Sequence, residues 1–185
     1  MVKNRMFVVG AITVFAGYLA GVLTVLFAGG ASGDYLRRFL TSQATPNWLA
    51  AFLSGPFFVL LVYFCGVFFL GWLFVFPLLY YKSYGYGYTA GLLLAGLGGR
   101  GFLPLALCLF PSAVAECLLL VCMAREALPQ SVALFQSRKG DAQAFLSGLS
   151  SYLLHGLVWV QCSAFVLLWD LFLSPLILSG ISEIL

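Results

Sequence analysis

Long apolar runs, each about as long as a membrane-crossing helix, are the feature of this sequence that most limits its fold. Spanning the hydrocarbon core of a bilayer takes ~20 apolar residues, and three runs reach that length easily, namely 6–28, 56–81 and 148–173. A fourth run, 102–124, also qualifies, although it contains two prolines and a glutamate. Hydrophobic residues make up 63% of the chain and charged residues 8%, far from the composition of a soluble domain. We therefore expect an all-α integral membrane protein with one polytopic domain over residues 1–185.

The N-terminal run resembles a secretory signal because two basic residues, Lys3 and Arg5, precede it and small residues follow it. The apolar core of a cleaved signal is usually 7–15 residues long. The run 6–28 is longer than this, and we therefore expect an uncleaved signal anchor with its N-terminus in the cytoplasm.

A glycine-rich stretch, "KSYGYGYTAGLLLAGLGGRG" from Lys82 to Gly101, decides how many times the chain crosses the membrane. Its apolar part, 84–98, makes only ~22 Å of helix at 1.5 Å per residue, against a core of ~30 Å. Positive residues favour the cytoplasmic side. If 84–98 crosses, six of the nine cations lie inside, whereas only four lie inside if it does not. The six cations are Lys3, Arg5, Lys82, Arg125, Arg138 and Lys139, with Arg37, Arg38 and Arg100 outside. We therefore expect a bundle of about five transmembrane helices, with the C-terminus outside.

Two pairs of glycines predict where helices pack closely. Gly17 and Gly21 lie four residues apart in the first run, and Gly87 and Gly91 have the same spacing in the glycine-rich stretch. Glycines at this spacing share one helix face and allow close backbone approach in membranes.

Few ionisable residues fall inside the predicted spans. Counted inward from the outer end of its span, Glu116 lies nearer the cytoplasmic face. Counted inward from the cytoplasmic end of its own span, His155 lies at nearly the same depth. We therefore expect the two residues to form a hydrogen-bonded polar pair. The alternative role for this pair is a proton or ion relay. Asp170 and Arg100 both belong near the outer interface, where they can pair or reach water separately.

Other motifs point away from catalysis and cofactors. The string "GLGGRG" matches a dinucleotide-binding fingerprint, but it lacks the strand and βαβ unit that this fingerprint requires. The chain has one histidine and no hydrolase or metalloprotease motif, and its five cysteines lie in apolar runs without metal-ligand spacing. The nine cations form no nucleic-acid patch. We expect no enzymatic activity, no cofactor, no metal and no nucleic-acid partner.

The region from Tyr80 to Pro111 resembles the signature of the stage II sporulation protein M family. Members of that family show an apolar run ending in Lys-Gly, an aromatic residue, Gly-Phe-Thr, Leu-Gly-x-Lys-Gly and a proline-containing helix. The matching positions here are Lys82, Tyr84, Gly87, Thr89, Gly98, Arg100, Gly101 and Pro111. The sequence departs from this pattern where Ser83 replaces glycine, Arg100 replaces lysine, and 112–113 replaces Gln-Asn.

The resemblance implies a non-enzymatic membrane scaffold for engulfment in endospore-forming bacteria. Such a scaffold anchors the peptidoglycan-degrading stage II sporulation proteins D and P in the mother-cell membrane at the septum. These partner proteins would dock on helix faces, on 33–53 or on the C-terminal tail. Membrane lipids would also contact the chain, and so would other copies of the chain in a homo-oligomer. The alternative is a small transporter or permease subunit with its site near Glu116, at a proline-broken helix.

Overall fold

The computed structural model describes residues 2–27, 48–97, 102, 105–137, 142–173 and 175–176, and within this part the chain is helical apart from short turns. The α-helices are α1 (Val2–Phe27), α3 (Trp48–Ser54), α4 (Pro56–Val67), α5 (Gly71–Leu97), α7 (Phe110–Ser137) and α8 (Ala142–Leu168). Two short π-helices, η2 (Leu105–Leu109) and η3 (Trp169–Leu173), precede α7 and follow α8.

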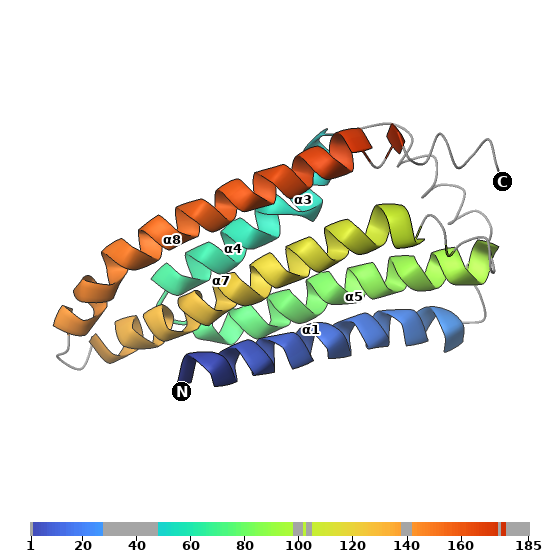
Figure 1. Cartoon of the computed structure of the whole chain (residues 1–185). Helices are drawn as coiled ribbons and strands as arrows, with labels where there is room; N and C mark the ends of the chain where they lie inside the picture. Colours follow the sequence, from blue (N-terminus) through green and yellow to red (C-terminus); the bar gives the residue numbers. More distant parts are fainter. Residues whose placement is uncertain are drawn as a thin grey trace.

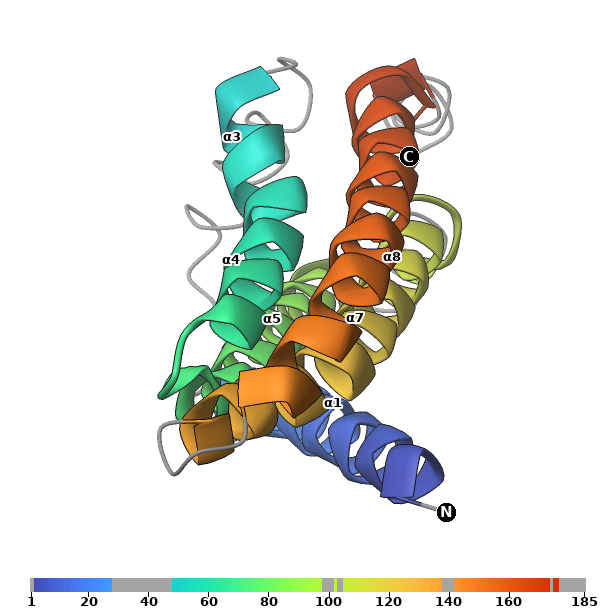
Figure 2. The ribbon, with the colours of Figure 1, turned by 90° about the vertical axis from the view of Figure 1, so that its left-hand side faces the viewer.

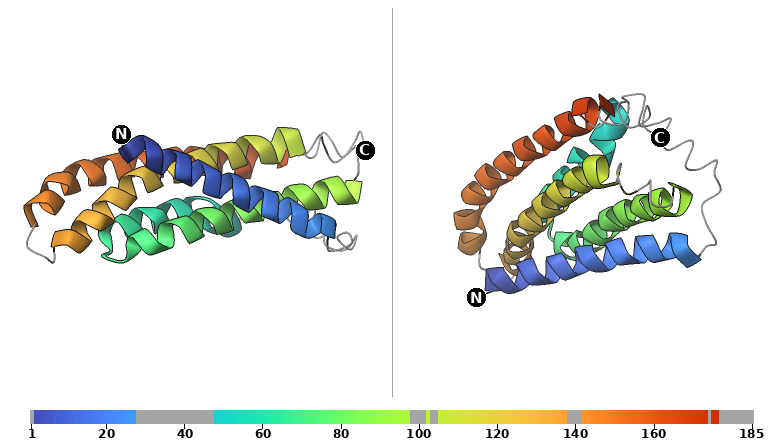
Figure 3. Two further views of the ribbon diagram at one scale, coloured as in Figure 1. Left: turned by 90° about the horizontal axis from the view of Figure 1, so that it is seen from below. Right: turned by 45° about the vertical axis from the view of Figure 1, so that its right-hand side comes forward.

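The long helices run alternately up and down the bundle. In Figure 1, α1 runs from left to right, α3 and α4 return together, and α5, α7 and α8 continue the alternation. The end-on view places α5 and α7 in the middle, with α1 on one side and α4 and α8 on the other (Figure 2). The views from below and from the side show α1 lying along α5 (Figure 3).

Three of the described helical segments are long and apolar enough to cross a membrane. They are Arg5–Phe27, Leu105–Phe135 and Gly148–Leu173, and Pro56–Val67 is a shorter apolar helix. These segments give the chain the character of a membrane protein. The first and last coincide closely with the predicted spans 6–28 and 148–173. The predicted span 102–124 overlaps a longer helical segment, because α7 continues through Pro129 to Ser137.

The predicted division between the second and third spans is wrong. We expected a helix over 56–81 and a separate short one over 84–98, with Lys82 marking the membrane surface between them. Instead, α5 runs without interruption from Gly71 to Leu97 and carries Lys82 in its middle. The chain reverses earlier, at 68–70, directly after α4.

A serine from another helix holds that early turn. Phe68, which ends α4, is extended, with φ −90° and ψ 137°. The fully buried Ser131 of α7 donates a hydrogen bond of 2.7 Å to the Phe68 carbonyl and accepts one of 3.0 Å from the Trp72 N–H. The hydroxyl therefore pairs the Trp72 N–H and gives a second hydrogen bond to the Phe68 carbonyl, which also accepts one of 3.0 Å from the Gly71 N–H. Unpaired backbone groups inside the bundle would be expensive.

Helices α1 and α5 meet through glycine. A methyl group on Gly17 would collide with Ser83 and the Tyr80 carbonyl oxygen, and one on Gly21 would collide with the backbone of α5 near Tyr84. On the other side, Gly87 lies directly on the Tyr18 carbonyl. Backbones this close gain extensive van der Waals contact, which is a main source of helix association in lipid.

Helix α8 is attached to the rest of the bundle along a narrow strip. The Tyr152 ring stacks on Tyr63 with centroids 5.3 Å apart, and its hydroxyl donates a hydrogen bond to the Tyr63 carbonyl. Gly66 and Gly156 leave the space that these two rings occupy. Most of the remaining surface of α8 is exposed.

Candidate functional site: a buried ion pair at a helix break

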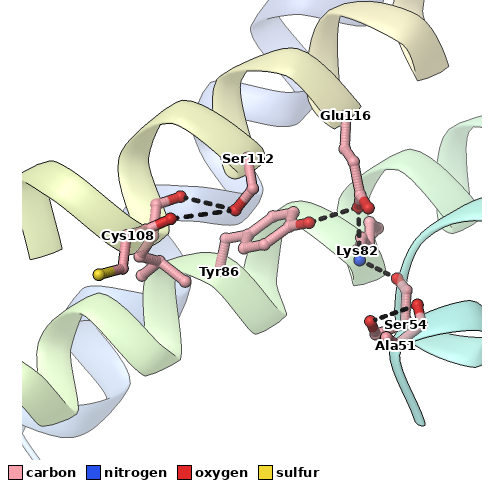
Figure 4. A network of polar contacts seen from close by, with 8 residues as sticks. Ala51, Ser54, Lys82, Tyr86, Cys108, Ser112 and Glu116 are labelled. Atoms are coloured by element: carbon pink, nitrogen blue, oxygen red, sulfur yellow. Dashed lines mark hydrogen bonds and ion pairs between the residues drawn. The ribbon is translucent and has the colours of Figure 1, made fainter. Parts of the chain in front are cut away.

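A lysine and a glutamate form an ion pair in the middle of the bundle. Lys82 Nζ of α5 lies 2.8 Å from Glu116 Oε2 of α7, and the two side chains are only 8% and 2% exposed. The Tyr86 hydroxyl, one turn further along α5, donates a hydrogen bond to the same carboxylate oxygen. Figure 4 shows the three side chains converging between α5 and α7.

The third element of the site is the break between α3 and α4. Pro56 begins α4. In a continuous helix the Phe58 N–H would donate to the Ser54 carbonyl, but here it donates to the Gly55 carbonyl at 3.0 Å. That free Ser54 carbonyl accepts a hydrogen bond from Lys82 Nζ (Figure 4). Irregular backbone is tolerated at membrane depth where the protein itself satisfies it, and Lys82 does so here.

Gly55 leaves the space that the Glu116 carboxylate occupies. A side chain at this position would overlap Glu116 Oε1, so the carboxylate packs directly on the backbone of the break. The φ of Gly55 is −113°, so glycine is required here for space and not for its backbone conformation.

Aromatic rings complete the surroundings of the ammonium group. Lys82 Nζ lies 4.4 Å from the centre of the Tyr86 ring and 5.5 Å from that of Phe58. An ammonium group has three donors. In this site the carboxylate, a backbone carbonyl and ring faces surround the group, and each of these stabilises a cation.

A second carboxylate, that of Asp170, lies near this cluster. Asp170 of η3 is close enough to Glu116, Lys82 and Ser112 to interact electrostatically with them. Ser112 lies one turn before Glu116 in α7 and donates to the Leu109 carbonyl at 3.2 Å. The ion pair therefore joins α3, α5 and α7, and Asp170 links the last helical segment to the same place.

The expected pair of Glu116 and His155 does not form. Glu116 points to Lys82, whereas His155 Nδ1 of α8 lies 3.4 Å from Glu126 Oε2 and its side chain is 60% exposed. The physical reason is the change in α5. Once Lys82 lies inside the bundle, its ammonium group lies within ion-pair distance of Glu116, whereas His155 lies beside Glu126.

The other predicted site residues have mainly packing roles where the structure describes them. Tyr84 stacks between two tyrosines, one on the preceding and one on the following turn of α5. The Thr89 hydroxyl bonds the Gly85 carbonyl of its own helix at 3.0 Å. Gly91 lies against Val25 of α1, and Pro111 is the second residue of α7. Gly98, Arg100 and Gly101 lie outside the described residues, and so does the proposed contact between Arg100 and Asp170.

Sequence reasoning missed the site at Lys82. The positive-inside rule assigns an isolated cation to a membrane surface, and it placed Lys82 there. The triplet Ser54-Gly55-Pro56 could have indicated that Lys82 is buried. It breaks the helix and frees a backbone carbonyl, which can then pair with a buried cation.

No family model, curated protein or solved structure matches this chain. Its function must therefore be argued from its own residues and geometry.

Proposed function

We propose that the chain crosses the membrane five times, with its N-terminus in the cytoplasm and its C-terminus outside. The five antiparallel legs, α1, α3 with α4, α5, α7 and α8, support this arrangement (Figure 1). With Lys82 inside the bundle, the cation count still favours it. The cytoplasmic cations would be Lys3, Arg5, Arg125, Arg138 and Lys139, against Arg37, Arg38 and Arg100 outside.

Tag accessibility tests this topology. A protease site placed after residue 185 should be cleaved from the outside of intact cells, and the same site before residue 1 should be protected. Cleavage of the C-terminal site only after the cells are opened would refute the five-crossing topology.

We propose that this membrane protein is a non-enzymatic scaffold of the sporulation engulfment machinery. In this role it anchors the peptidoglycan-degrading stage II sporulation proteins D and P in the mother-cell membrane at the septum. The proposal starts from the resemblance of the region around Lys82 to the stage II sporulation protein M family.

The scaffold proposal is carried by the contacts that residues of the glycine-rich stretch make with neighbouring helices. Lys82 closes the ion pair with Glu116, and Gly87 and Gly91 pack α5 onto α1. These residues fix the relative positions of helices, and the two buried charges satisfy each other. A motif that serves rigidity suits a protein whose task is to hold others in place.

Co-purification from sporulating cells of the native host tests the scaffold. The tagged chain, extracted in mild detergent, should bring down proteins D and P, as identified by mass spectrometry. A tagged polytopic protein from the same membrane is the control bait. Recovery of the chain without any cell-wall hydrolase above that control would eliminate the scaffold proposal.

A transporter is the second candidate, and the helix break favours it. Broken helices that point backbone carbonyls at a charged centre in mid-membrane are typical of secondary transporters. Ser54 presents such a carbonyl to Lys82, and η2 adds a π-helical segment at the start of α7. Proton flux into liposomes under an imposed pH gradient tests this function for a proton-coupled carrier. Flux that Glu116→Gln abolishes while the protein stays folded would favour the transporter over the scaffold.

A further inference from the structure

The outer face of α8, continued into η3, carries a regular seam of exposed side chains. Its members follow one another at alternating spacings of three and four residues and are Ser151, Leu154, Val158, Gln161, Phe165, Leu168 and Phe172. All of them are exposed, including Phe165 at 73% and Leu154 at 69%. Alternating spacings of three and four are those of residues that meet a second helix in a left-handed coiled coil.

The seam is as long as the membrane is thick. From Ser151 to Phe172 it extends about 30 Å at 1.5 Å per residue, which matches the hydrocarbon core. It also lies opposite the strip through which α8 contacts its own bundle, where Tyr152, Gly156 and Ser163 are buried. The seam is therefore free to face a neighbour in the membrane.

Gln161 lies in the middle of the seam, close to the midpoint of the candidate span Gly148–Leu173. Within the part of the chain that the structure describes, nothing hydrogen-bonds its amide. A primary amide facing hydrocarbon has lost its water partners, which is unfavourable.

Three other exposed polar side chains of the described membrane helices have partners within their own chain. The hydroxyls of Thr13 and Thr24 on α1 donate to the carbonyls of Val9 and Ala20 in their own helix, at 2.9 and 2.8 Å. His155, beside the seam, has Glu126 of the same chain within 3.4 Å. Gln161 differs from these three groups in having no hydrogen-bond partner among the described residues of its own chain.

We propose that α8 is a self-association surface, on which two copies of this chain pair along the seam with their Gln161 amides hydrogen-bonded to each other. A primary amide carries both donors and an acceptor, so two identical amides facing each other across a two-fold axis form reciprocal hydrogen bonds. Two copies inserted in the same direction place their Gln161 residues at the same depth in the membrane. A helix of a different protein could pair with Gln161 only if it carried a polar residue at that depth. A single polar residue in an apolar seam also fixes the register of the two helices. This dimer does not depend on the scaffold function proposed above.

Energy transfer between labelled copies in lipid vesicles tests the dimer. Full-length chains carrying a donor or an acceptor fluorescent protein at the N-terminus are reconstituted together in phosphatidylcholine–phosphatidylglycerol liposomes over a range of protein-to-lipid ratios. The wild type should show saturable transfer above the random-proximity level of a monomeric membrane protein. Photobleaching at low density should show two steps per spot.

Substitutions on α8 distinguish the seam from the rest of the helix. Gln161→Leu should weaken association about threefold to twentyfold, the range measured for one hydrogen bond between membrane helices. Gln161→Asn keeps the amide and should retain most of the association. Phe165→Ala on the seam should weaken association, whereas Leu153→Ala, of the same helix but off the seam, should not. The three side chains that these four variants change are exposed, so each variant is expected to fold, which its thermal melt in detergent checks.

Three outcomes would overturn the proposal. They are transfer at the random level for the wild type at every ratio, undiminished association of Gln161→Leu, and complexes that bleach in more than two steps.

Discussion

Removing one partner of the central ion pair should destabilise the protein far more than removing both. Lys82→Met leaves the Glu116 carboxylate, 2% exposed, with the Tyr86 hydroxyl as its remaining close partner. Glu116→Leu leaves the ammonium facing a backbone carbonyl and two rings. An uncompensated buried charge costs about 3–5 kcal/mol of unfolding free energy, so we expect a loss of that size from each substitution.

The double variant Lys82→Met/Glu116→Leu removes both charges. What remains is a Tyr86 hydroxyl and a Ser54 carbonyl without partners, at about 1 kcal/mol each, or about 2 kcal/mol together. Since the single losses add to at least about 6 kcal/mol, the double variant should be more stable than additivity predicts by about 4 kcal/mol or more.

Unfolding by increasing mole fraction of sodium dodecyl sulfate in mixed micelles, followed by circular dichroism, measures these free energies. Thr24→Ala serves as the control, because its exposed hydroxyl bonds only its own helix, and it should change stability by no more than about 0.5 kcal/mol. Single variants within 1 kcal/mol of the wild type, or a double variant as unstable as the sum of the singles, would refute the conclusion that the two charges are buried together.

The same assay tests three further contacts. Gly21→Ala should lower stability by about 1–3 kcal/mol because its methyl group would meet the α5 backbone, whereas Gly85→Ala, with nothing within 4 Å, should raise it by about 0.5–1 kcal/mol. Equal shifts of the two glycine variants would contradict the close α1–α5 contact. Ser131→Ala should cost about 1–2 kcal/mol, because it leaves the Trp72 N–H of the α4–α5 turn unpaired while the Phe68 carbonyl keeps its bond from the Gly71 N–H, and a neutral result would mean that water reaches this turn. Tyr152→Phe should cost about 1 kcal/mol by losing one hydrogen bond while keeping the ring stacked, and Tyr152→Ala should cost clearly more, so equal losses would mean that the stacking contributes nothing.

The sequence was sufficient to predict the helical class and the extent of the first and last apolar segments, because lipid imposes a strict length and a strict composition on a spanning helix. The span 148–173 was predicted at the residues where the structure has it. The glycine pairs of the first and third legs face each other, as Gly21 and Gly87 illustrate. These features follow from local spacing, which a single sequence contains in full.

The position of Lys82 could not be predicted in the same way, because it depends on another helix. A lysine inside a bundle is tolerable only if a carboxylate arrives at the same depth, and that depth depends on where the preceding helices begin and end. The reversal at 68–70 has no charge or proline to announce it, and it is held by Ser131, some sixty residues later in the chain. Without that reversal, Lys82 falls at a membrane surface and Glu116 is left to His155.

The serine that holds the α4–α5 turn also has a consequence for biosynthesis. When α4 and α5 leave the ribosome, Glu116 and Ser131 have not yet followed them into the membrane, so the turn lacks the hydrogen bonds from Ser131 and Lys82 has no counter-charge. We expect the first half of the chain to remain incompletely inserted, held by the translocon or an insertase, until α7 arrives and supplies both groups at once. A chain that stops at Leu97 would then be a substrate for membrane proteases rather than a smaller version of the protein.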